Sequence, residues 1–436
     1  MREIGELADQ GVDLVRVLWS DLHGIARGKD LTLDELPRAV EHGVGFCQAV
    51  LLTGLDAEPL ETSETSGTGW PDAFARPDLS TLAIADHDPG VAVCLADIVD
   101  SQTGTPLPLS PRDLLRLAVS RLSARDLQPV VGPELEFSLC RPAGDGWTEY
   151  LDRDTAGYIV GAANDPFGLI PLLMRRCRAL GIPVFAGNHE FSGGQFEINI
   201  RHSGALAAAD HAFLFKHVTK EVAAQQGIRA TFMGKPFAAR AGNGTHLHLS
   251  LVDSAGHNAC YDPASPHGLS TVAQSFLGGL IEHAPALTAI LNPTVNAFKR
   301  LGAALAPAVA NWGPDNRAAF VRIPPERGPG TRLEVRIGDG TTNPYLAIAA
   351  LLAAGLDGID RGCPLPPPVT RDDPTAGAPL PATLDAALLA LEDDKILTEA
   401  LGPRFTELFI ALKRAESRRF AMAVTDWEFR EYSWLL

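Results

Sequence analysis

Two glutamates on a predicted strand begin the part of the sequence that can do chemistry. In Gly-Pro-Glu134-Leu-Glu136-Phe the carboxylates alternate with apolar residues, so Glu134 and Glu136 project from the same face of a strand. Two neighbouring like charges repel each other unless a cation or a proton neutralises them. The pair alone indicates either a solvated strand face or part of a cation site, and the choice depends on other segments.

A second segment, residues 189–199 (HEFSGGQFEIN), adds two more glutamates. Glu197 alternates with apolar residues and therefore shares a strand face with its polar neighbours. Glu190 precedes Glu197 by seven residues, an odd separation that would place the two on opposite faces of a straight strand. The Gly193-Gly194 pair between them supplies a bend that can turn Glu190 to the same side.

Two further predicted strands carry histidines and a mixed row of charges. In GNGTHLHLS, His246, His248 and Ser250 share one face after a glycine-rich turn, which is a better ligand pattern than a lone histidine. In TRLEVR, Glu334 lies between two arginines on the polar face. That face predicts either a structural row of ion pairs or one more carboxylate beside two cations for a bound anion.

Together these strands offer five glutamates and one or two histidines. Such an oxygen-rich, charged set suits Mg²⁺ or Mn²⁺, whereas a structural zinc site would use cysteines or several histidines. Lys299-Arg300, Arg317 and Arg322 add cations. Arginines beside divalent ions are what phosphoryl transfer requires, because its transition state spreads negative charge over the phosphoryl oxygens. The sequence has no Walker A loop, so metals and arginines would have to hold a nucleotide.

The elements that position these residues alternate between strands and helices. A helix start at Ser110-Pro111 follows a proline-rich stretch and places a boundary between a first domain, residues 1–105, and a second, residues 106–436. The alternation predicts an α+β fold in which a sheet is backed by helices. The predicted strands cover residues 13–19, 91–98, 129–140, 182–186, 195–201, 245–252, 318–323 and 332–337. The predicted helices cover residues 167–180, 205–226, 270–284, 343–355, 383–400 and 403–424, with a loop over 363–381.

Composition narrows the class of protein. A length of 436 residues favours two domains, and 46% hydrophobic with 21% charged residues excludes a disordered or collagen-like chain. Fifty-three acidic against 37 basic residues give a formal charge of −16, which disfavours nucleic acid and anionic membranes as partners. No apolar stretch is long enough for a membrane span, the N-terminus has no apolar leader, and the six cysteines are scattered. We therefore expect a soluble cytoplasmic protein with reduced thiols.

In order and spacing, several segments resemble the glutamine synthetase superfamily. They are DLVRVLWSDLHGIARGK, GPELEF, HEFSGGQFEIN, GNGTHLHLSL, NPTVNAFKRL, WGPDNRAAFVRIP, TRLEVRIGDGTTNPYLAIAALLAAG and VTDWEFREY. The pattern is similar to the bacterial type I branch and most similar to γ-glutamyl-amine and polyamine synthetases. The resemblance implies a small N-terminal β-grasp domain and a large catalytic domain with a curved antiparallel sheet. It also implies a homo-oligomer, usually a double-ring dodecamer, with sites completed between subunits.

The resemblance further implies a two-step reaction and a role for each matching residue. ATP would phosphorylate a γ-carboxylate, and an amine would then displace phosphate from the acyl phosphate. Two or three Mg²⁺ or Mn²⁺ ions would be bound, one by Glu136, Glu190 and Glu197 and a second by Glu134, His246 and Glu334. The nucleotide would meet His248, Ser250 and Arg322. The amino-acid substrate would meet Gly242, Arg300 and Arg336, and the catalytic arginines would be Arg317, at the γ-phosphate, and Arg336.

Three departures from the family pattern concern the binding of ammonium and glutamate. Ala306 stands where the family's flap carries a glutamate that accepts a proton from ammonium, and Ala241 replaces an asparagine that binds glutamate. The Asp-x-x-Ser ammonium pocket is not recognisable in residues 56–72. We therefore expect an ATP-dependent ligase that forms a γ-glutamyl amide with an organic amine. A catalytically impaired regulator that binds nucleotide or amino acid is the first alternative, and a metallohydrolase that uses no ATP is the second.

Overall fold

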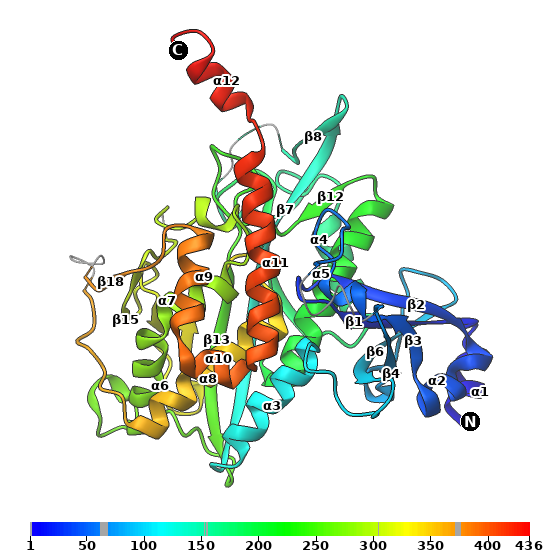
Figure 1. Ribbon diagram of the computed structural model, residues 1–436, viewed down its shortest axis with the longest axis horizontal. Coiled ribbons are helices and arrows are strands. Elements are labelled where there is room, and N and C mark those ends of the chain that lie inside the picture. The colour runs from blue at the N-terminus through cyan, green and yellow to red at the C-terminus, as the bar shows by residue number, and fades with distance from the viewer. Residues whose placement is uncertain (1, 62–68, 152, 154–155, 304, 371–375) are drawn as a thin grey trace.

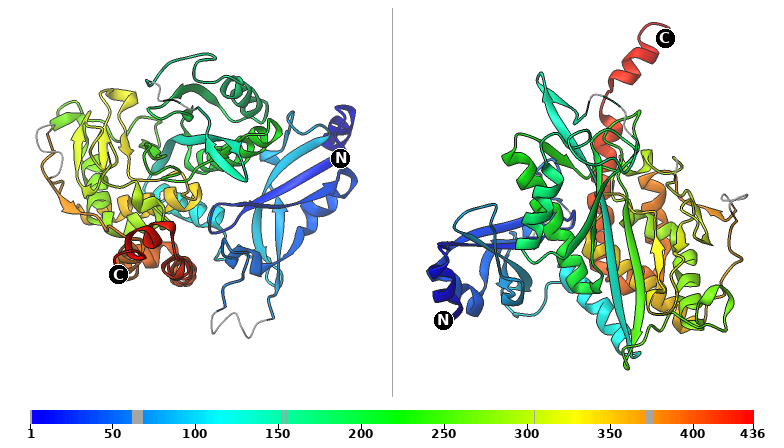
Figure 2. Two further views of the ribbon diagram at one scale, coloured as in Figure 1. Left: turned by 90° about the horizontal axis from the view of Figure 1, so that it is seen from above. Right: turned by 180° about the vertical axis from the view of Figure 1, so that it is seen from behind.

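The chain folds into a small N-terminal sheet unit beside a larger unit in which helices pack on one large sheet (Figure 1). The computed structural model describes residues 2–61, 69–151, 153, 156–303, 305–370 and 376–436. Seen from above, the N-terminal sheet lies to one side of the larger unit (Figure 2). This arrangement of an N-terminal β domain and a larger α/β unit confirms the predicted fold class.

The N-terminal unit is built on a sheet whose described strands run in the order β2-β1-β6-β4-β3, with β5 paired to β6. β1 and β6 run parallel and the other pairs are antiparallel. Trp19 stacks on Phe46 with ring centroids 4.4 Å apart and fixes β1 against β3. The elements are α1 (Arg2–Asp9), β1 (Leu14–Ser20), β2 (Ala26–Thr32), α2 (Leu36–His42), β3 (Val44–Cys47), β4 (Asp72–Pro77), β5 (Ala83–Ile84) and β6 (Val91–Asp100).

The large sheet runs in the order β15-β16-β17-β13-β7-β10-β9 over the described residues, and β8, β11 and β12 also pair with β7. Its pairs are antiparallel except that β15 runs parallel to β16 at one edge. The sheet is therefore mixed rather than wholly antiparallel. The strands are β7 (Leu127–Ala143), β8 (Gly146–Glu149), β9 (Val184–His189), β10 (Gln195–Ile200), β11 (Ser203–Gly204), β12 (Arg229–Thr231), β13 (Thr245–Asp253), β15 (Trp312–Pro314), β16 (Val321–Ile323) and β17 (Leu333–Val335).

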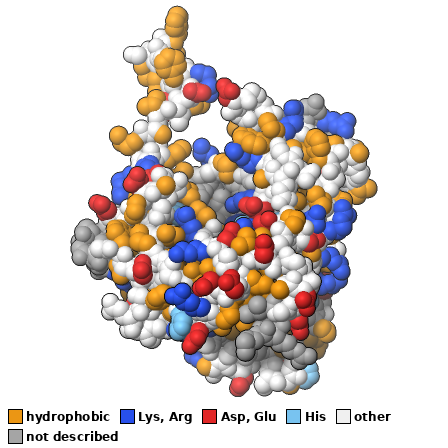
Figure 3. Space-filling model, turned by 90° about the vertical axis from the view of Figure 1, so that its right-hand side faces the viewer, with side chains coloured by type: hydrophobic (Ala, Val, Ile, Leu, Met, Phe, Trp, Pro, Cys, Tyr) orange, Lys and Arg blue, Asp and Glu red, His pale blue; other side chains and the backbone are white. Residues whose placement is uncertain are grey.

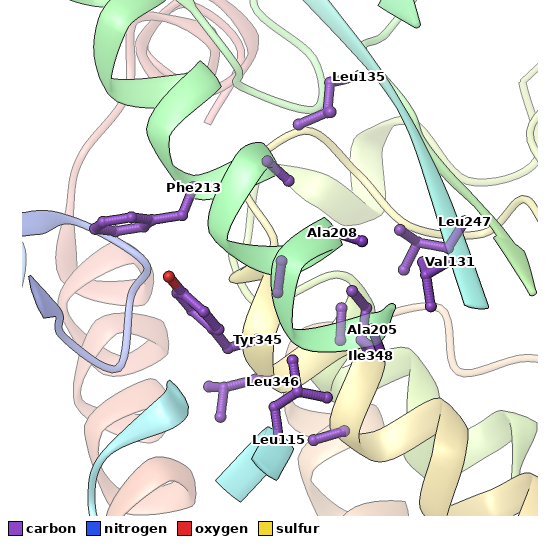
Figure 4. Packing of buried hydrophobic residues seen from close by; sticks show 14 of the residues in the cluster. Leu115, Val131, Leu135, Ala205, Ala208, Phe213, Leu247, Tyr345, Leu346 and Ile348 are labelled. Carbon is purple, nitrogen blue, oxygen red and sulfur yellow. The ribbon is translucent and has the colours of Figure 1, made fainter. Parts of the chain in front are cut away.

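Helix α5 packs between the large sheet and α8, and the buried side chains of these elements form one core (Figure 4). Leu135 and Val131 of β7 point toward α5, while Phe213 of α5 lies 5.6 Å from the ring of Tyr345 on α8. The helices are α3 (Pro111–Ser123), α4 (Leu169–Ala179), α5 (Ala205–Gln225), α6 (Thr271–Glu282), α7 (Ala284–Leu291), α8 (Pro344–Arg361), α9 (Leu384–Asp393), α10 (Lys395–Leu401), α11 (Pro403–Met422) and α12 (Asp426–Tyr432). A two-residue pair, β14 (Val309–Ala310) with β18 (Ala378–Pro379), lies apart from the sheets.

Several predicted elements differ from the structure. The single helix expected over residues 383–400 is two helices, α9 and α10, because the Asp394 side chain accepts the backbone N–H of Leu397 and starts a new helix. The strand expected over residues 318–323 begins only at Val321, since the residues before it form a turn in which the N–H of Ala319 donates to Asn316. The strand expected over residues 332–337 is β17, which covers only Leu333–Val335, so the predicted site residue Arg336 lies just beyond its end. The strand expected over residues 182–186 is shifted to β9, Val184–His189.

The C-terminal segment projects away from the body of the molecule. Helix α12 stands beyond α11 in Figure 1, and Figure 3 shows hydrophobic side chains along this projection. Met422, Val424 and Trp434 are among its exposed side chains. None of the described helices is long and apolar enough to cross a membrane.

A buried arginine joins the two units. Arg112 of α3 makes a bidentate contact with Asp210 of α5, both distances being 2.9 Å, and also donates to Asp78 and Asp97 of the N-terminal unit at 2.8 and 2.5 Å. Tyr345 donates to the same Asp210 at 2.8 Å. Because Arg112 is only 5% exposed, its loss would leave the buried carboxylate of Asp210 without a counter-charge.

We expect Arg112→Met to lower the free energy of unfolding by about 3–5 kcal/mol, because it breaks a buried ion-pair network by removing one partner. Urea unfolding followed by circular dichroism measures the loss. Arg116→Met is the matched control, since Arg116 lies on the same helix and contacts the same Asp97 but is half-exposed. The control should cost about 1 kcal/mol or less, and equal losses in the two variants would contradict the assignment.

Candidate active site

Strand register brings the predicted ligands opposite one another across four neighbouring strands. Glu136 of β7 pairs with Glu197 of β10. On the other side of β7, Glu134 pairs with His246 of β13. His248 of β13 in turn lies opposite Glu334 of β17. The polar faces predicted from alternation therefore converge on one region of the large sheet.

The ligand atoms of this acidic cluster lie close together. The cluster comprises Glu134, Glu136, Glu190, Glu197 and Glu334 with His246 and His248. The Glu134 carboxylate lies 3.6 Å from His246 Nδ1 and 3.0 Å from His248 Nε2. Two triplets have ligand atoms that all lie within 4.8 Å of one another, namely Glu134 with His248 and Glu334, and Glu134 with Glu197 and His246.

These triplets differ in membership from the two ligand sets that the family resemblance implies. Glu136, expected to hold the first ion, instead accepts the backbone N–H of Gly244 at 2.7 Å and the Gln195 amide at 3.0 Å. Such hydrogen bonds orient its carboxylate without any ion. The assignment of each ligand to an individual ion therefore stays a prediction.

The glycine bend predicted between Glu190 and Glu197 is present. Gly194 has a φ of +90°, and a Cβ there would lie 2.6 Å from Cβ of Tyr150, so only glycine fits. Beyond the bend, the Glu190 N–H donates to the Gln195 carbonyl at 2.8 Å, and Asn188 donates to the Glu190 carboxylate at 2.6 Å. Glu190 and Glu197 line the same cavity, as the bend was expected to allow.

The carboxylates of the cluster include two with lowered and two with raised pKa values. Burial would raise the pKa of Glu134, but hydrogen bonds with His246 and His248 outweigh it and hold the pKa well below its usual range. The pKa of Glu334 likewise falls to about 2 against the effect of burial, chiefly because of Arg336. Burial and the neighbouring carboxylates raise the pKa of Glu190 to about 7 and that of Glu197 to about 9.

This excess of negative charge fits a site for divalent cations. Carboxylate oxygens with one or two imidazole nitrogens form a hard donor set of the kind that Mg²⁺ and Mn²⁺ accept. Over the described residues, Glu190 and Glu197 make no ion pair with Lys or Arg, whereas Glu334 has ion pairs with two arginines. Bound cations would supply the missing positive charge.

Three of the arginines that line the cavity also make hydrogen bonds within the protein. Arg336 donates to Glu334 and to the carbonyl of Arg317, while Arg322 donates to Glu334 at 2.7 Å and to Asp315. The mixed charge row predicted from TRLEVR is thus in part a set of ion pairs. Arg300 is buried and donates to the Ile337 carbonyl at 3.1 Å. All four arginines also line the cavity, so their remaining donors are available to an anion.

Gly242 has to be glycine for this site to form. A Cβ at Gly242 would lie 2.2 Å from the carbonyl oxygen of Gly234 and 2.9 Å from Cγ of Arg300. The carbonyl of Gly242 accepts the Gln195 amide at 3.0 Å, which ties this turn to the acidic cluster. This close approach of backbone segments explains why residue 242 is glycine. Its contact with the substrate stays a prediction.

Two cavities meet at Glu134. The larger, of about 610 Å³, is lined by the five glutamates, His246, the four arginines and Gly242, and by Ala241 and Ala306. The smaller, of about 240 Å³, is lined by His248, Ser250, Arg332 and Glu134. The residues predicted to meet ATP thus separate, with His248 and Ser250 in the smaller cavity and Arg322 in the larger.

Two of the positions at which the sequence was predicted to depart from the family pattern line the larger cavity. Ala306 is buried and Ala241 is exposed, and both line the cavity that contains the acidic cluster. The third departure cannot be placed in the same way because residues 62–68, within the stretch 56–72, lie outside the described residues. It stays a prediction.

Several lining residues escaped prediction from sequence. Asn188, which lies opposite Glu197 on β9, and Lys235 carried no recognisable motif. Asn188 had a weak signal, since it precedes Glu190 by two residues. Tyr158 and Phe191 also line the cavity, although no pattern in the sequence marked them as site residues.

Comparison with known proteins places this geometry in a family. The model of the glutamine synthetase catalytic domain matches residues 108–432. The chain belongs to the glutamine synthetase family. It is 34% identical to the glutamine synthetase of Halobacterium salinarum over 98% of this chain and 95% of that one. It is 37% identical to that of Methanocaldococcus jannaschii over 92% and 89%.

Solved structures agree in fold over the whole chain. A ligand-free structure of GmaS superposes with a TM-score of 0.88 at 35% identity, covering 99% of both chains. A GmaS/ADP complex gives 0.87 at the same identity and coverage. The chain is thus an ATP-dependent C–N ligase of a family that uses divalent metals.

The raised pKa values predict how pH and metal affect stability. Folded-state values of about 7 for Glu190 and about 9 for Glu197 exceed the ordinary 4.5, so the metal-free protein is most stable below pH 4.5 as far as these groups are concerned. Their contribution is lost as the pH rises through 7 and 9. In EDTA, the melting temperature should therefore fall over this interval, and Mn²⁺ should raise it more at pH 8.5 than at pH 6.

Glu197→Gln should flatten the decline in EDTA and reduce the stabilisation by Mn²⁺. The control is Glu431→Gln, since Glu431 is an exposed glutamate of α12 far from the cluster in sequence. Each ion should add about 2.7 kcal/mol at a free concentration of 100 times its Kd. Equal Mn²⁺ shifts at both pH values, or no difference between the two variants, would contradict the proposed cation site.

Proposed function

We propose that this chain joins an organic amine to the γ-carboxylate of glutamate, forming a γ-glutamyl amide with ATP as the energy source. The observation that carries the proposal is the contrast within one cavity. The acidic cluster and the arginines needed for phosphoryl transfer are all present, whereas Ala306 occupies the position of the family's ammonium-deprotonating glutamate. Structural similarity to GmaS, a γ-glutamylmethylamide synthetase, supports an amine as the second substrate.

The reaction would proceed in two steps. A γ-carboxylate oxygen of glutamate attacks the γ-phosphorus of ATP, the bond to the β–γ bridging oxygen breaks, and ADP leaves. The neutral amine nitrogen then attacks the acyl carbon, a C–N bond forms, and the C–O bond breaks so that inorganic phosphate leaves with the electron pair. The nitrogen loses one proton to solvent or to a base.

The chain's own residues would bind and orient the reactants. Arg317 would face the transferring phosphoryl group, and Arg300 and Arg336 would bind carboxylates of the amino acid. Ser250 and His248 would contact the nucleotide from the smaller cavity. Two or more Mg²⁺ or Mn²⁺ ions, held by the acidic cluster, would supply Lewis-acid neutralisation of phosphate charge.

The assembly belongs to the same proposal. We infer a homo-oligomer, in keeping with the double-ring dodecamers of the family, in which the N-terminal unit of one subunit completes the site of its neighbour. The N-terminal sheet lies to one side of the larger unit, where a neighbouring subunit can contact it, and this supports the inference.

The proposal predicts amine-dependent turnover. With Mg²⁺, ATP and glutamate, methylamine or a larger primary amine should stimulate phosphate release and yield a γ-glutamyl amide detectable by mass spectrometry. Ammonium should support a rate at least about tenfold lower, since the site lacks the carboxylate that accepts its proton. Full glutamine synthesis from ammonium would contradict the proposal, and no turnover with any amine would favour the regulatory alternative.

Ala306→Glu should shift the preference toward ammonium by restoring a carboxylate at the flap, with a gain of about 10²-fold if it acts as a base. Ala303→Glu is the control, because it adds the same charge to the same segment at another lining position. A similar gain in both variants would show that net charge alone, rather than the flap position, controls the choice of nucleophile.

A further inference from the structure

Part of the lining of the larger cavity carries no charge over the residues that the structure describes. It consists of two aromatic rings and small or aliphatic side chains from four separate stretches of the chain. We refer to it as the apolar wall. Its members are Tyr158, Phe191, Ala241, Ala303, Leu305 and Ala306.

The two aromatic residues lie side by side next to the acidic cluster. Tyr158 is held by a hydrogen bond from its N–H to the His189 carbonyl at 2.9 Å, directly before Glu190 in the chain. A Cβ at Gly157 would lie 3.6 Å from the ring of Phe191, so the 157–158 segment and that ring are in contact. The pKa of Tyr158 is raised by partial burial and then by the negative charge of Glu190 and Glu197.

Both aromatic side chains are largely exposed to solvent. Tyr158 is 70% exposed and Phe191 is 63% exposed, although both border a cavity rich in charge. Leu305, which lines the same cavity, is 47% exposed. Apolar area presented to a binding cavity is area that a ligand can remove from water.

The charges around the larger cavity limit what such a ligand can carry. Among the described residues that line it, every carboxylate belongs to the five glutamates of the acidic cluster. The remaining charged lining residues are cations, and they include Lys235 and Arg240, which already interacts with Glu149 at 2.6 Å. Among these described residues of one subunit, the apolar wall itself thus offers no carboxylate to a second ammonium group.

We propose that the amine substrate is a primary monoamine with an uncharged alkyl or aralkyl tail, and that the apolar wall binds this tail. The inference rests on the proposed amine ligase activity and narrows its substrate class, excluding polyamines. The neutral amine nitrogen faces the reacting carboxyl near the acidic cluster. The carbon tail packs on Phe191, Tyr158 and Leu305.

A pair of amines of equal length tests the inference directly. n-Pentylamine and 1,4-diaminobutane have the same number of non-hydrogen atoms and differ in whether the far end carries a charge. With Mg²⁺, ATP and glutamate, kcat/KM for n-pentylamine should exceed that for 1,4-diaminobutane by about tenfold or more, because a charged group gains nothing from an apolar wall. Ammonium and methylamine are measured in parallel.

Two variants connect this preference to the wall. Phe191→Ala should lower kcat/KM for n-pentylamine about tenfold more than it lowers kcat/KM for methylamine. Phe167→Ala is the matched control, since Phe167 is 62% exposed but packs on Tyr150 outside the cavity. Leu305→Glu supplies a carboxylate at the wall and should raise the relative use of 1,4-diaminobutane about tenfold.

The outcomes separate this inference from the function on which it rests. Better use of 1,4-diaminobutane than of n-pentylamine by the unmodified protein would overturn the inference and leave the amine ligase proposal standing. Turnover with ammonium but with none of the organic amines would overturn both the inference and the amine ligase proposal. Equal effects of Phe191→Ala and Phe167→Ala on n-pentylamine would also overturn the assignment of the wall, and circular dichroism melting confirms that each variant is folded.

Discussion

The structure around this site depends on the repulsion among five glutamates that one sheet forces together. β7 pairs with β10 on one side and with β13 on the other, so its two carboxylates cannot move away from Glu197 and His246 without breaking the ladder. The neighbouring imidazoles and arginines hold the pKa values of Glu134 and Glu334 low, but Glu190 and Glu197 retain raised pKa values. A sheet that holds unneutralised charge in this way is prepared for cations.

Much of this arrangement was predictable because strands have a period of two. Alternation placed Glu134 with Glu136 and His246 with His248, and the two glycines before Gln195 indicated the bend that brings Glu190 round. Each of these short-range inferences holds in the structure. The main helices were also predictable, since Ser110 with Pro111 and Asn343 with Pro344 mark helix starts by local capping.

What the sequence could not predict depends on contacts between distant segments. The triplets of close ligand atoms combine residues from β7, β10, β13 and β17, and strand register is not readable from any one strand. The joining of the two units by Arg112 needs partners at Asp78 and Asp210, each more than thirty residues away. Tyr158 and Phe191 likewise gain meaning only because the fold places them beside the same cavity as Ala306.

In the proposed function, the acidic cluster and the arginines activate phosphate, whereas the part of the site that meets the nucleophile differs from the family. The central claim is that an acyl phosphate links the two steps. Glutamate labelled with ¹⁸O in its γ-carboxylate tests this claim most directly, with Mg²⁺, ATP and a primary monoamine present. The account predicts one ¹⁸O atom in each inorganic phosphate released, because a carboxylate oxygen bonds to phosphorus and leaves with it. Release of unlabelled phosphate would show that water attacks ATP directly and would contradict the account.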